Sequence, residues 1–178
     1  MDGAVSTHAS SSPFGINSKK FGMWLFIVSD ALTFSTLLVC YTYLRMSSPN
    51  WPAPFKFSPS ILFSTLMTLV LLTSSLTMVK GWLRATMFFG ATFVVLHLTE
   101  WKHLLAEGIT PSTPFGATFF TITGLHMVHV TIGIIYLGII AARRYPQEDI
   151  EVAGLYWHFV DLVWMFIFPL IYLMSVQR

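Results

Sequence analysis

The sequence predicts an all-α integral membrane protein of five transmembrane helices. Three observations support this fold class. Hydrophobic residues make up 54% of the 178 residues and charged residues only 10%, whereas a soluble domain typically carries about 25% charged residues. Five apolar segments each have close to the roughly 20 residues that a helix needs to cross a bilayer. Short connections rich in Pro, Gly or charged residues separate these segments.

The first apolar segment, at about 21–45, follows a polar stretch at 1–18 that is rich in Ser. Lys19 and Lys20 precede the segment as they would precede a signal peptide. The apolar run is too long for a signal peptide, however, and it ends without a clear cleavage site. We therefore expect a polar N-terminal lead-in at 1–18, a membrane domain at 19–178 and a first helix that is retained.

Residues that end helices separate the remaining four segments. Prolines crowd the first connection, Gly81 lies in a tight second one, Gly108 and Pro111 lie in the third, and Pro146 lies in the fourth. The expected helices are about 58–79, 83–105, 115–142 and 152–176.

Basic residues favour a cytoplasmic N-terminus and an external C-terminus, because cytoplasmic loops carry an excess of Lys and Arg. In this orientation the inner basic residues are Lys19, Lys20, Lys80, Arg84, Arg143 and Arg144, and the outer ones are Arg45, Lys56, Lys102 and Arg178. Trp24, Trp82 and Trp157 would then anchor the inner interface, and Trp51 and Trp101 the outer one.

Composition also narrows the function. The net charge is +2 and no basic cluster is present, so we expect no nucleic-acid partner. Cys40 is the only cysteine, which excludes a disulfide or a c-type haem attachment within the chain. No nucleophile motif of covalent catalysis occurs.

Seven ionisable residues fall within the expected membrane helices: Asp30, His97, Glu100, His126, His129, His158 and Asp161. A charge at the bilayer centre costs at least about 2.5 kcal/mol, so these side chains should face the bundle. A rise of about 1.5 Å per residue places Asp30 roughly 14 Å from the inner face. On the same scale, His126 and Asp161 lie at the level of Asp30. We expect one buried polar network, Asp30, His126, His129, His158 and Asp161, and a separate outer pair, His97 and Glu100.

The residues alone leave three roles open for this network. The groups could form a hydrogen-bonded packing core, a proton-linked relay, or a metal or haem site. A di-metal site lacks the expected ExxH motifs on facing helices, while a bis-histidine haem would use His129 and His158. We predict a hydrogen bond between Asp30 and His126, because the two lie at matched depth, and this bond requires a separation within about 3.5 Å.

Three stretches carry a family resemblance: GMWLFIVSDALTF at 22–34, TFFTITGLHMVHVTIG at 118–133 and LYWHFVDLVWMFIFPLIYL at 155–173. Together with LTEWKHLL at 98–105, their order and wording resemble subunit III of haem-copper oxidases, the cytochrome c and quinol oxidases. The resemblance covers nearly all of the chain from Phe21 onward. It implies the short, five-helix form of the family, which lacks the two leading helices that line a lipid cleft in the long form.

The resemblance extends to the ionisable residues. Asp30 stands where the family typically has a membrane-embedded Glu, and the side chain here is one methylene shorter. The residues that match the family pattern in type and place are His126, His129, His158, Asp161 and Glu100.

The resemblance implies a non-catalytic subunit in the plasma (inner) membrane of a prokaryote, within an oxidase that reduces oxygen to water and pumps protons. Haem and copper would belong to partner subunits, and none would bind this chain. The implied partners are catalytic subunit I, the other oxidase subunits and membrane phospholipid. The expected role is to stabilise the catalytic subunit and to support proton uptake. Alternatives are an accessory subunit of a nitric-oxide reductase, a haem-bearing redox subunit, and a small proton-coupled transporter.

Overall fold

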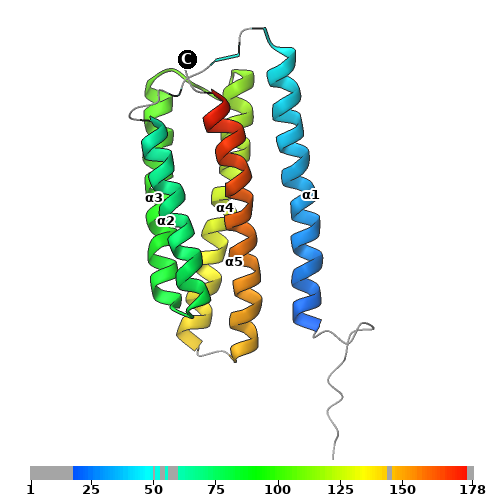
Figure 1. Cartoon of the computed structure of the whole chain (residues 1–178), viewed down its shortest axis with the longest axis vertical. Coiled ribbons are helices and arrows are strands. Elements are labelled where there is room, and N and C mark those ends of the chain that lie inside the picture. The colour runs from blue at the N-terminus through cyan, green and yellow to red at the C-terminus, as the bar shows by residue number, and fades with distance from the viewer. Residues whose placement is uncertain (1–17, 50, 53–54, 56–59, 144–145, 176–178) are drawn as a thin grey trace, which may run out of the picture.

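The computed structural model describes residues 18–49, 51–52, 55, 60–143 and 146–175, and their fold is an all-α bundle of five helices (Figure 1). The helices are α1 (Ser18–Ser47), α2 (Leu62–Val79), α3 (Leu83–Ala106), α4 (Pro114–Arg143) and α5 (Gln147–Ile167). A π-helical turn, Phe168–Tyr172, and a 3₁₀ turn, Leu173–Ser175, extend α5. The expected all-α class is confirmed, and residues 1–17 of the expected lead-in lie outside the described residues.

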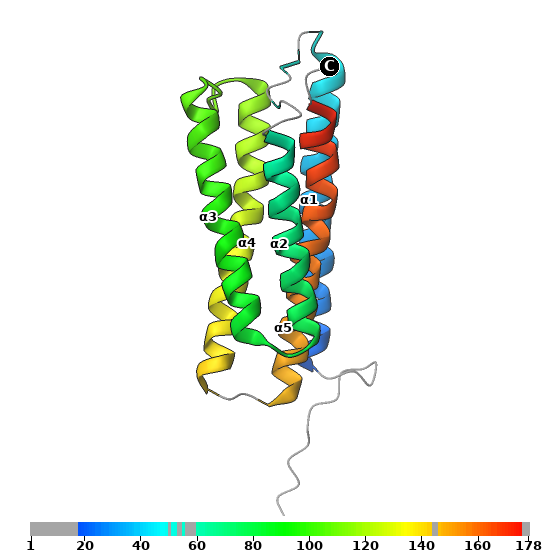
Figure 2. The ribbon, with the colours of Figure 1, turned by 60° about the vertical axis from the view of Figure 1, so that its left-hand side comes forward.

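Consecutive helices run in opposite directions, so α1, α3 and α5 begin at the same end of the bundle (Figures 1 and 2). We call this the proximal end, and the end where α1 finishes and Ser175 lies the distal end. Helices α2 to α5 pack as a four-helix group, with α2 against α3 and α5, and α4 against α3 and α5. Helix α1 packs along one edge of this group, where it contacts α4 and α5.

Among the described residues, four helices are long and apolar enough to cross a membrane, judged by length and composition: α1, α2, α4 and α5 with its extension. Their outer surfaces carry large apolar side chains such as Leu32, Leu76, Val128 and Phe166. Contiguous exposed apolar surface of this kind normally faces lipid or a protein partner.

Helix α3 is less apolar overall, because Arg84, His97 and Glu100 lie within it. His97 and Glu100 are nevertheless buried inside the bundle, whereas Phe88 is 67% exposed and Val95 59% exposed. Between its two ends, α3 therefore shows a largely apolar surface to its surroundings.

Gly81 and Gly108 lie just after the C-terminal ends of α2 and α3. Both have positive φ angles, 71° and 86°, which glycine adopts at little cost because it has no Cβ. After Gly81, the Trp82 amide donates to the Thr77 carbonyl (2.9 Å), and the Ile109 amide after Gly108 donates to the Leu104 carbonyl (3.0 Å). In each bond the donor lies five residues after the acceptor. This spacing is typical of Schellman caps, which satisfy the last carbonyls of a helix.

Trp157 lies at the centre of the four-helix group rather than at the membrane interface. Its side chain is 1% exposed, and its Nε1 donates to the Ser74 hydroxyl at 3.0 Å. Gly90 on α3 and Gly133 on α4 leave room for the indole, since a Cβ on either would lie under 3 Å from it. The prediction that Trp157 is an interface anchor is wrong, because two glycines create a space that only this large ring fills.

Helix α5 begins at Gln147, about one turn before the predicted start at 152. Pro146 precedes the helix, and Glu148 and Asp149 occupy its first turn, where carboxylates interact favourably with the positive end of the helix dipole. The acidic residues predicted to lie in a loop thus belong to the helix. Lys19 contacts Asp149 at 2.6 Å, which joins the first turns of α1 and α5.

Candidate functional site: buried histidines and carboxylates

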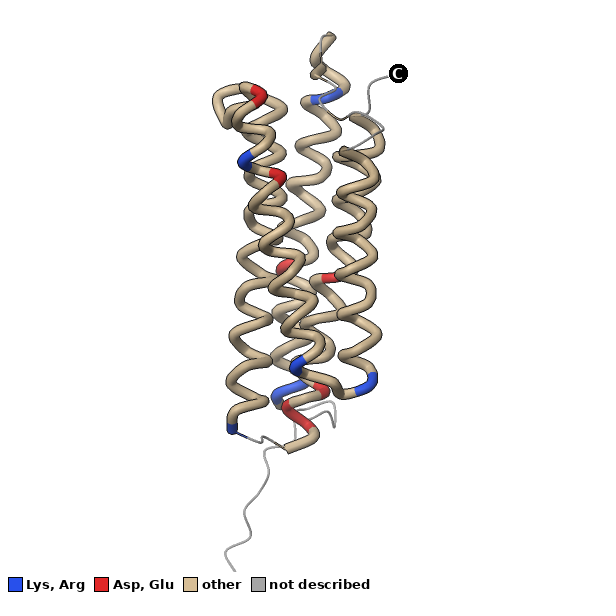
Figure 3. Tube along the Cα trace, turned by 90° about the vertical axis from the view of Figure 1, so that its left-hand side faces the viewer, with Lys and Arg blue, Asp and Glu red and all other residues tan. Residues whose placement is uncertain are grey.

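Most charged residues gather at the two ends of the bundle, and a few acidic residues lie between them (Figure 3). All seven ionisable residues predicted to lie within the membrane helices are on described helices. Five of them are buried: His97, Glu100, His126, His129 and Asp161. Asp30 and His158 are partly buried. The structure divides the seven residues among three places in the bundle.

The first place is the interface of α1 and α4, where Asp30 meets His129. Nε2 of His129 lies 3.2 Å from Oδ1 of Asp30, and Nδ1 of the same ring lies 2.7 Å from the Leu125 carbonyl. A carbonyl oxygen only accepts hydrogen bonds, so we assign the proton-bearing role to Nδ1. A proton between Nε2 and Asp30 could then reside on the carboxyl or on the imidazole.

The predicted hydrogen bond between Asp30 and His126 is absent, because His129 occupies the position facing Asp30. Residues three apart on a helix differ by about 60° in direction. That rotation turns His129 toward α1 and leaves His126 pointing into the four-helix group. Matched depth alone therefore selected the wrong histidine.

The second place surrounds His126 in the middle of the bundle. Its ring stacks on Trp164 of α5, with centroids 5.1 Å apart, and meets Phe93 of α3 edge-on at 5.8 Å. His97 stacks on Phe93 at 5.7 Å and meets Trp164 edge-on at 5.5 Å. We call these four residues the ring cluster. It places His126 and His97 against the same two aromatic rings.

The histidine nitrogens of the ring cluster are buried without hydrogen bonds. Neither nitrogen of His126 and neither nitrogen of His97 has a hydrogen-bond partner among the described residues. Nδ1 of His97 lies 3.4 Å from Oε2 of Glu100, a close contact whose orientation is unsuitable for a hydrogen bond. Buried polar atoms in proteins normally have a partner in protein or ordered water, so these four nitrogens call for an explanation.

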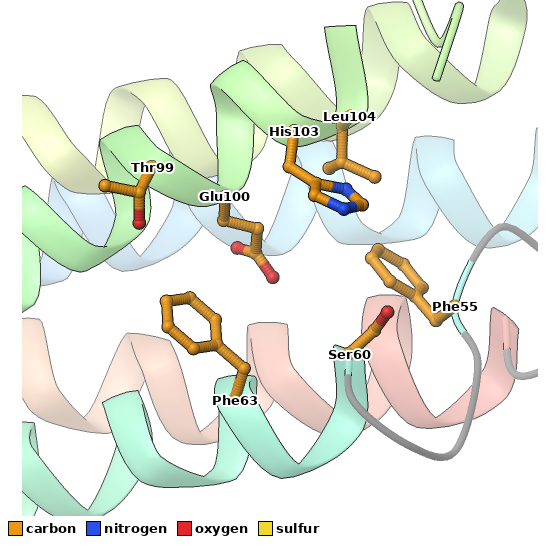
Figure 4. A pocket seen from close by; sticks show the side chains of 7 residues that line it. All are labelled: Phe55, Ser60, Phe63, Thr99, Glu100, His103 and Leu104. Carbon is orange, nitrogen blue, oxygen red and sulfur yellow. The ribbon is translucent and has the colours of Figure 1, made fainter. Parts of the chain in front are cut away.

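Glu100 ends this polar region toward the distal side. The Tyr172 hydroxyl donates to Oε2 at 2.7 Å, and the Ser64 hydroxyl contacts Oε1 at 3.0 Å. A pocket of about 290 Å³ adjoins the carboxyl group, with Phe55, Phe63 and Ser60 among its walls. Figure 4 shows the Glu100 carboxyl directed into the space between α2 and α3. His97 and Glu100 lie side by side on α3, and their burial depends on α2 and the end of α5.

The third place lies between α2 and α5, where Nδ1 of His158 is 2.7 Å from the Ser75 hydroxyl. Asp161 is buried one turn further along α5. Ser75 lies close to Asp161, but neither carboxyl oxygen has a partner in hydrogen-bond geometry within the described ranges. The expected single network is thus divided, because His158 and Asp161 face α2 while Asp30 and His129 lie at the α1–α4 interface.

Sequence reasoning missed the partners of these residues: Ser64, Ser75, Tyr172 and Trp164. Tyr172 offered a signal, since a tyrosine hydroxyl in an apolar run usually finds a partner when it is buried. The serines of α2 offered a weaker one, because Ser and Thr also bond their own helix backbone. Within the described part of the chain, no group of three or more His, Cys, Asp or Glu side chains is arranged to hold a metal ion.

The distal end of the bundle is held by a contact between α1 and the end of α5. Tyr41 and Ser175 are hydrogen-bonded through their hydroxyls at 2.9 Å, and the Arg45 guanidinium donates to the Met174 carbonyl. A cation at the C-terminal end of a helix satisfies free carbonyls and complements the helix dipole. Both ends of α1 are therefore fixed to α5 by polar contacts.

Residues 5–176 match the family model described as cytochrome c oxidase subunit III. The chain belongs to the cytochrome c oxidase subunit III family. The relatives of this subunit III include cytochrome c oxidase subunit 3 of Bacillus subtilis, which is 34% identical over 89% of this chain and 87% of its own length. Cytochrome bo(3) ubiquinol oxidase subunit 3 of Pseudomonas putida is 32% identical, with 87% and 85% covered. Quinol oxidase subunit 3 of Bacillus subtilis is 34% identical, with 87% and 86% covered.

The family confirms the resemblance carried by the motifs around Asp30, His126 and His158. The chain is a subunit III of the haem-copper oxidases, and its long apolar helices make it a multi-pass membrane protein. Subunit III relatives carry the names of both cytochrome c oxidases and quinol oxidases. Family membership therefore implies assembly with other oxidase subunits.

Proposed function

We propose that this subunit III is a non-catalytic part of a terminal oxidase that reduces oxygen to water and pumps protons across a prokaryotic plasma membrane. In this proposal the chain docks beside catalytic subunit I, and haem and copper reside in the partner subunits. The observation that carries the proposal is the family match, which spans residues 5–176.

All five helices cross the membrane in this proposal, with the N-terminus in the cytoplasm. Support for the α3 span comes from its burial pattern. Its polar residues His97 and Glu100 face the bundle, and Phe88 and Val95 face outward. Lys19, Lys80 and Arg84 lie at the proximal ends of their helices, which favours the cytoplasm for that end.

Helix α1 is the surface that we propose docks against subunit I or its bound phospholipid. It lies at the edge of the bundle and contacts only two other helices extensively. Large apolar residues such as Leu25, Leu32 and Val39 remain exposed along its length. Oδ1 of Asp30 on this helix lies 3.2 Å from Nε2 of His129, and a proton that moves between these two atoms leaves the net charge of the pair unchanged. This arrangement supports a proton-linked role beside the catalytic subunit.

The proposal is tested by purifying the native complex through an affinity tag on this chain in mild detergent. We expect haem absorption, a co-purifying subunit I and oxygen consumption inhibited by cyanide. Recovery of a complex that reduces nitric oxide but does not consume oxygen would instead support the nitric-oxide reductase alternative. Haem bound to this chain after its separation from the other subunits would support the redox-subunit alternative.

A further inference from the structure

We propose that Glu100, His97 and His126 form a hydrated proton relay that connects the pocket at Glu100 with the Asp30–His129 pair. The relay goes beyond the proposed accessory role, because it gives the interior of this chain a proton-exchange route of its own. It runs from the α2–α3 pocket through the ring cluster to the α1–α4 interface.

The pocket provides the entrance. A water molecule occupies about 30 Å³ in the liquid, so the volume of about 290 Å³ has room for several. Ser60, Thr99 and His103 contribute polar groups to its lining, and Phe55 and Phe63 form apolar walls. His103 is largely exposed. Figure 4 shows the Glu100 carboxyl group on the inner side of this space.

Glu100 can gain or lose a proton without losing its contact with Ser64. The Ser64 hydroxyl has one proton and two neighbours, the Ser60 carbonyl at 3.0 Å and Oε1 of Glu100 at 3.0 Å. When Ser64 donates to the carboxylate, Glu100 is deprotonated. When Ser64 donates to the carbonyl, its oxygen can accept the proton of a neutral Glu100. The Tyr172 hydroxyl donates to the other carboxyl oxygen in both states.

His97 and His126 provide the interior steps. An imidazole can accept a proton at one nitrogen and release the proton of the other, which returns the ring to a neutral tautomer and conserves the number of protons. Such a step needs both nitrogens to be available, and both are free of hydrogen bonds to the described residues in each of these histidines. One contact is already short, since Nδ1 of His97 is 3.4 Å from Glu100. The two rings also share Phe93 and Trp164 as neighbours.

Water is the remaining component of the relay. The indole N–H of Trp164 donates to Thr68, so it is not available to the histidines. Four unpartnered buried nitrogens would each carry a desolvation cost in a dry core, whereas a buried water can satisfy two to four such groups. Ring stacking alone does not use these nitrogens.

Asp30 is the inner end of the relay. Its Oδ2 is buried without a hydrogen-bond partner in the described structure, while Oδ1 contacts His129. Phe34, one turn along α1, meets the rings of both His126 (6.5 Å) and His129 (5.4 Å). A water between Oδ2 and His126 would complete the route.

The test follows hydrogen–deuterium exchange by infrared spectroscopy in the complex purified through this chain. Bands that disappear in Glu100→Gln and Asp30→Asn identify the two carboxyl groups. After transfer to D₂O, we expect His126→Phe to slow exchange at Asp30 at least about tenfold and to leave exchange at Glu100 unchanged. His158→Phe is the matched control, because this histidine lies on the α2–α5 side and should affect neither band.

A second variant keeps the test decisive if His126→Phe does not assemble. Ser60→Phe fills the pocket at its surface, and the relay predicts slower exchange at both carboxyl groups. Unchanged exchange at Asp30 in either variant overturns the relay, as does exchange at Asp30 that is faster than at Glu100 in the unaltered complex. Failure to recover an oxidase would count against the proposed function, whereas normal oxidase assembly with unaltered exchange counts against the relay alone.

Discussion

Glu100 shows how single residues decide which buried charges this bundle tolerates. The carboxyl group is only 8% exposed, and it lies among Ser64 of α2, His97 of its own helix and Tyr172 of the α5 extension. A buried polar group without a partner costs about 1–3 kcal/mol. The Tyr172 hydroxyl therefore matters for stability, although Tyr172 itself lies in an apolar run.

We expect Tyr172→Phe to destabilise the chain by about 1–3 kcal/mol, because it removes the hydroxyl that donates to Glu100 and leaves the ring in place. The measurement is the midpoint of thermal unfolding of the purified complex in detergent. Tyr43→Phe is the control, since Tyr43 is 68% exposed. Equal unfolding temperatures for the two variants would show that the Tyr172 hydroxyl contributes nothing.

At the same scale, the type of each buried residue could be predicted from the sequence, but its partner could not. Depth along a helix follows from counting residues, and it placed Asp30, His126 and His129 near one another. The choice between the two histidines depends on how α4 is rotated about its axis. Packing against all its neighbours sets that rotation, and here it directs His129 to Asp30.

At the level of whole helices, the Trp157 side chain of α5 packs between α3 and α4. Trp157 fills the space beside Gly90 and Gly133, and Ser74 of α2 accepts its indole hydrogen bond. Small residues commonly allow close approach between membrane helices. In this bundle they make room for an indole ring, so the tryptophan and the two glycines act as one packing unit.

Gly90→Ala should destabilise the bundle by about 1–3 kcal/mol through overpacking. The new Cβ would lie 2.6 Å from the Trp157 ring, and this clash outweighs the gain of up to about 1 kcal/mol in helix propensity. Thermal unfolding of the complex again provides the measurement. Gly22→Ala has no atom within 4 Å of its new Cβ, so it should be neutral or stabilising. A Gly90→Ala protein as stable as the unaltered one would contradict this packing unit.

The helix ends were predictable from local signals in most cases. Gly81 and Gly108 end α2 and α3 as their sequence context indicates. Helix α5 starts earlier than the predicted position 152, because Glu148, Asp149 and Glu151 belong to its first turns. The helix dipole favours acidic residues in this first turn, and Lys19 and Lys20 of α1 pair with Asp149 and Glu151. The ion pairs are visible only in the folded chain.

At the scale of the molecule, the question with the largest consequence is whether α3 crosses the membrane. Its ends are the α2–α3 turn at Lys80 and the α3–α4 connection that contains Ser112. A span places these two sites on opposite sides of the membrane. The excess of basic residues at the proximal end places the first of them in the cytoplasm.

This topology predicts the labelling of single cysteines in spheroplasts. With Cys40, which is exposed on α1, replaced by serine, we expect Ser112→Cys to react with a membrane-impermeant maleimide from outside. Lys80→Cys should react only after permeabilisation. Reaction of both from the same side would show that α3 does not span, and the reverse pattern would show the opposite orientation.

The sequence alone determined the fold class, the number of helices, most of their ends and the family. These features depend on composition, on apolar length and on local motifs, all of which are properties of contiguous residues. The tertiary structure decided which polar residues meet. It joined Asp30 to His129, placed His126 and His97 against the same two aromatic rings, and buried Glu100 beside Tyr172. Such contacts depend on the rotation and tilt of helices relative to one another, and the packing of large side chains such as Trp157 and Trp164 sets both.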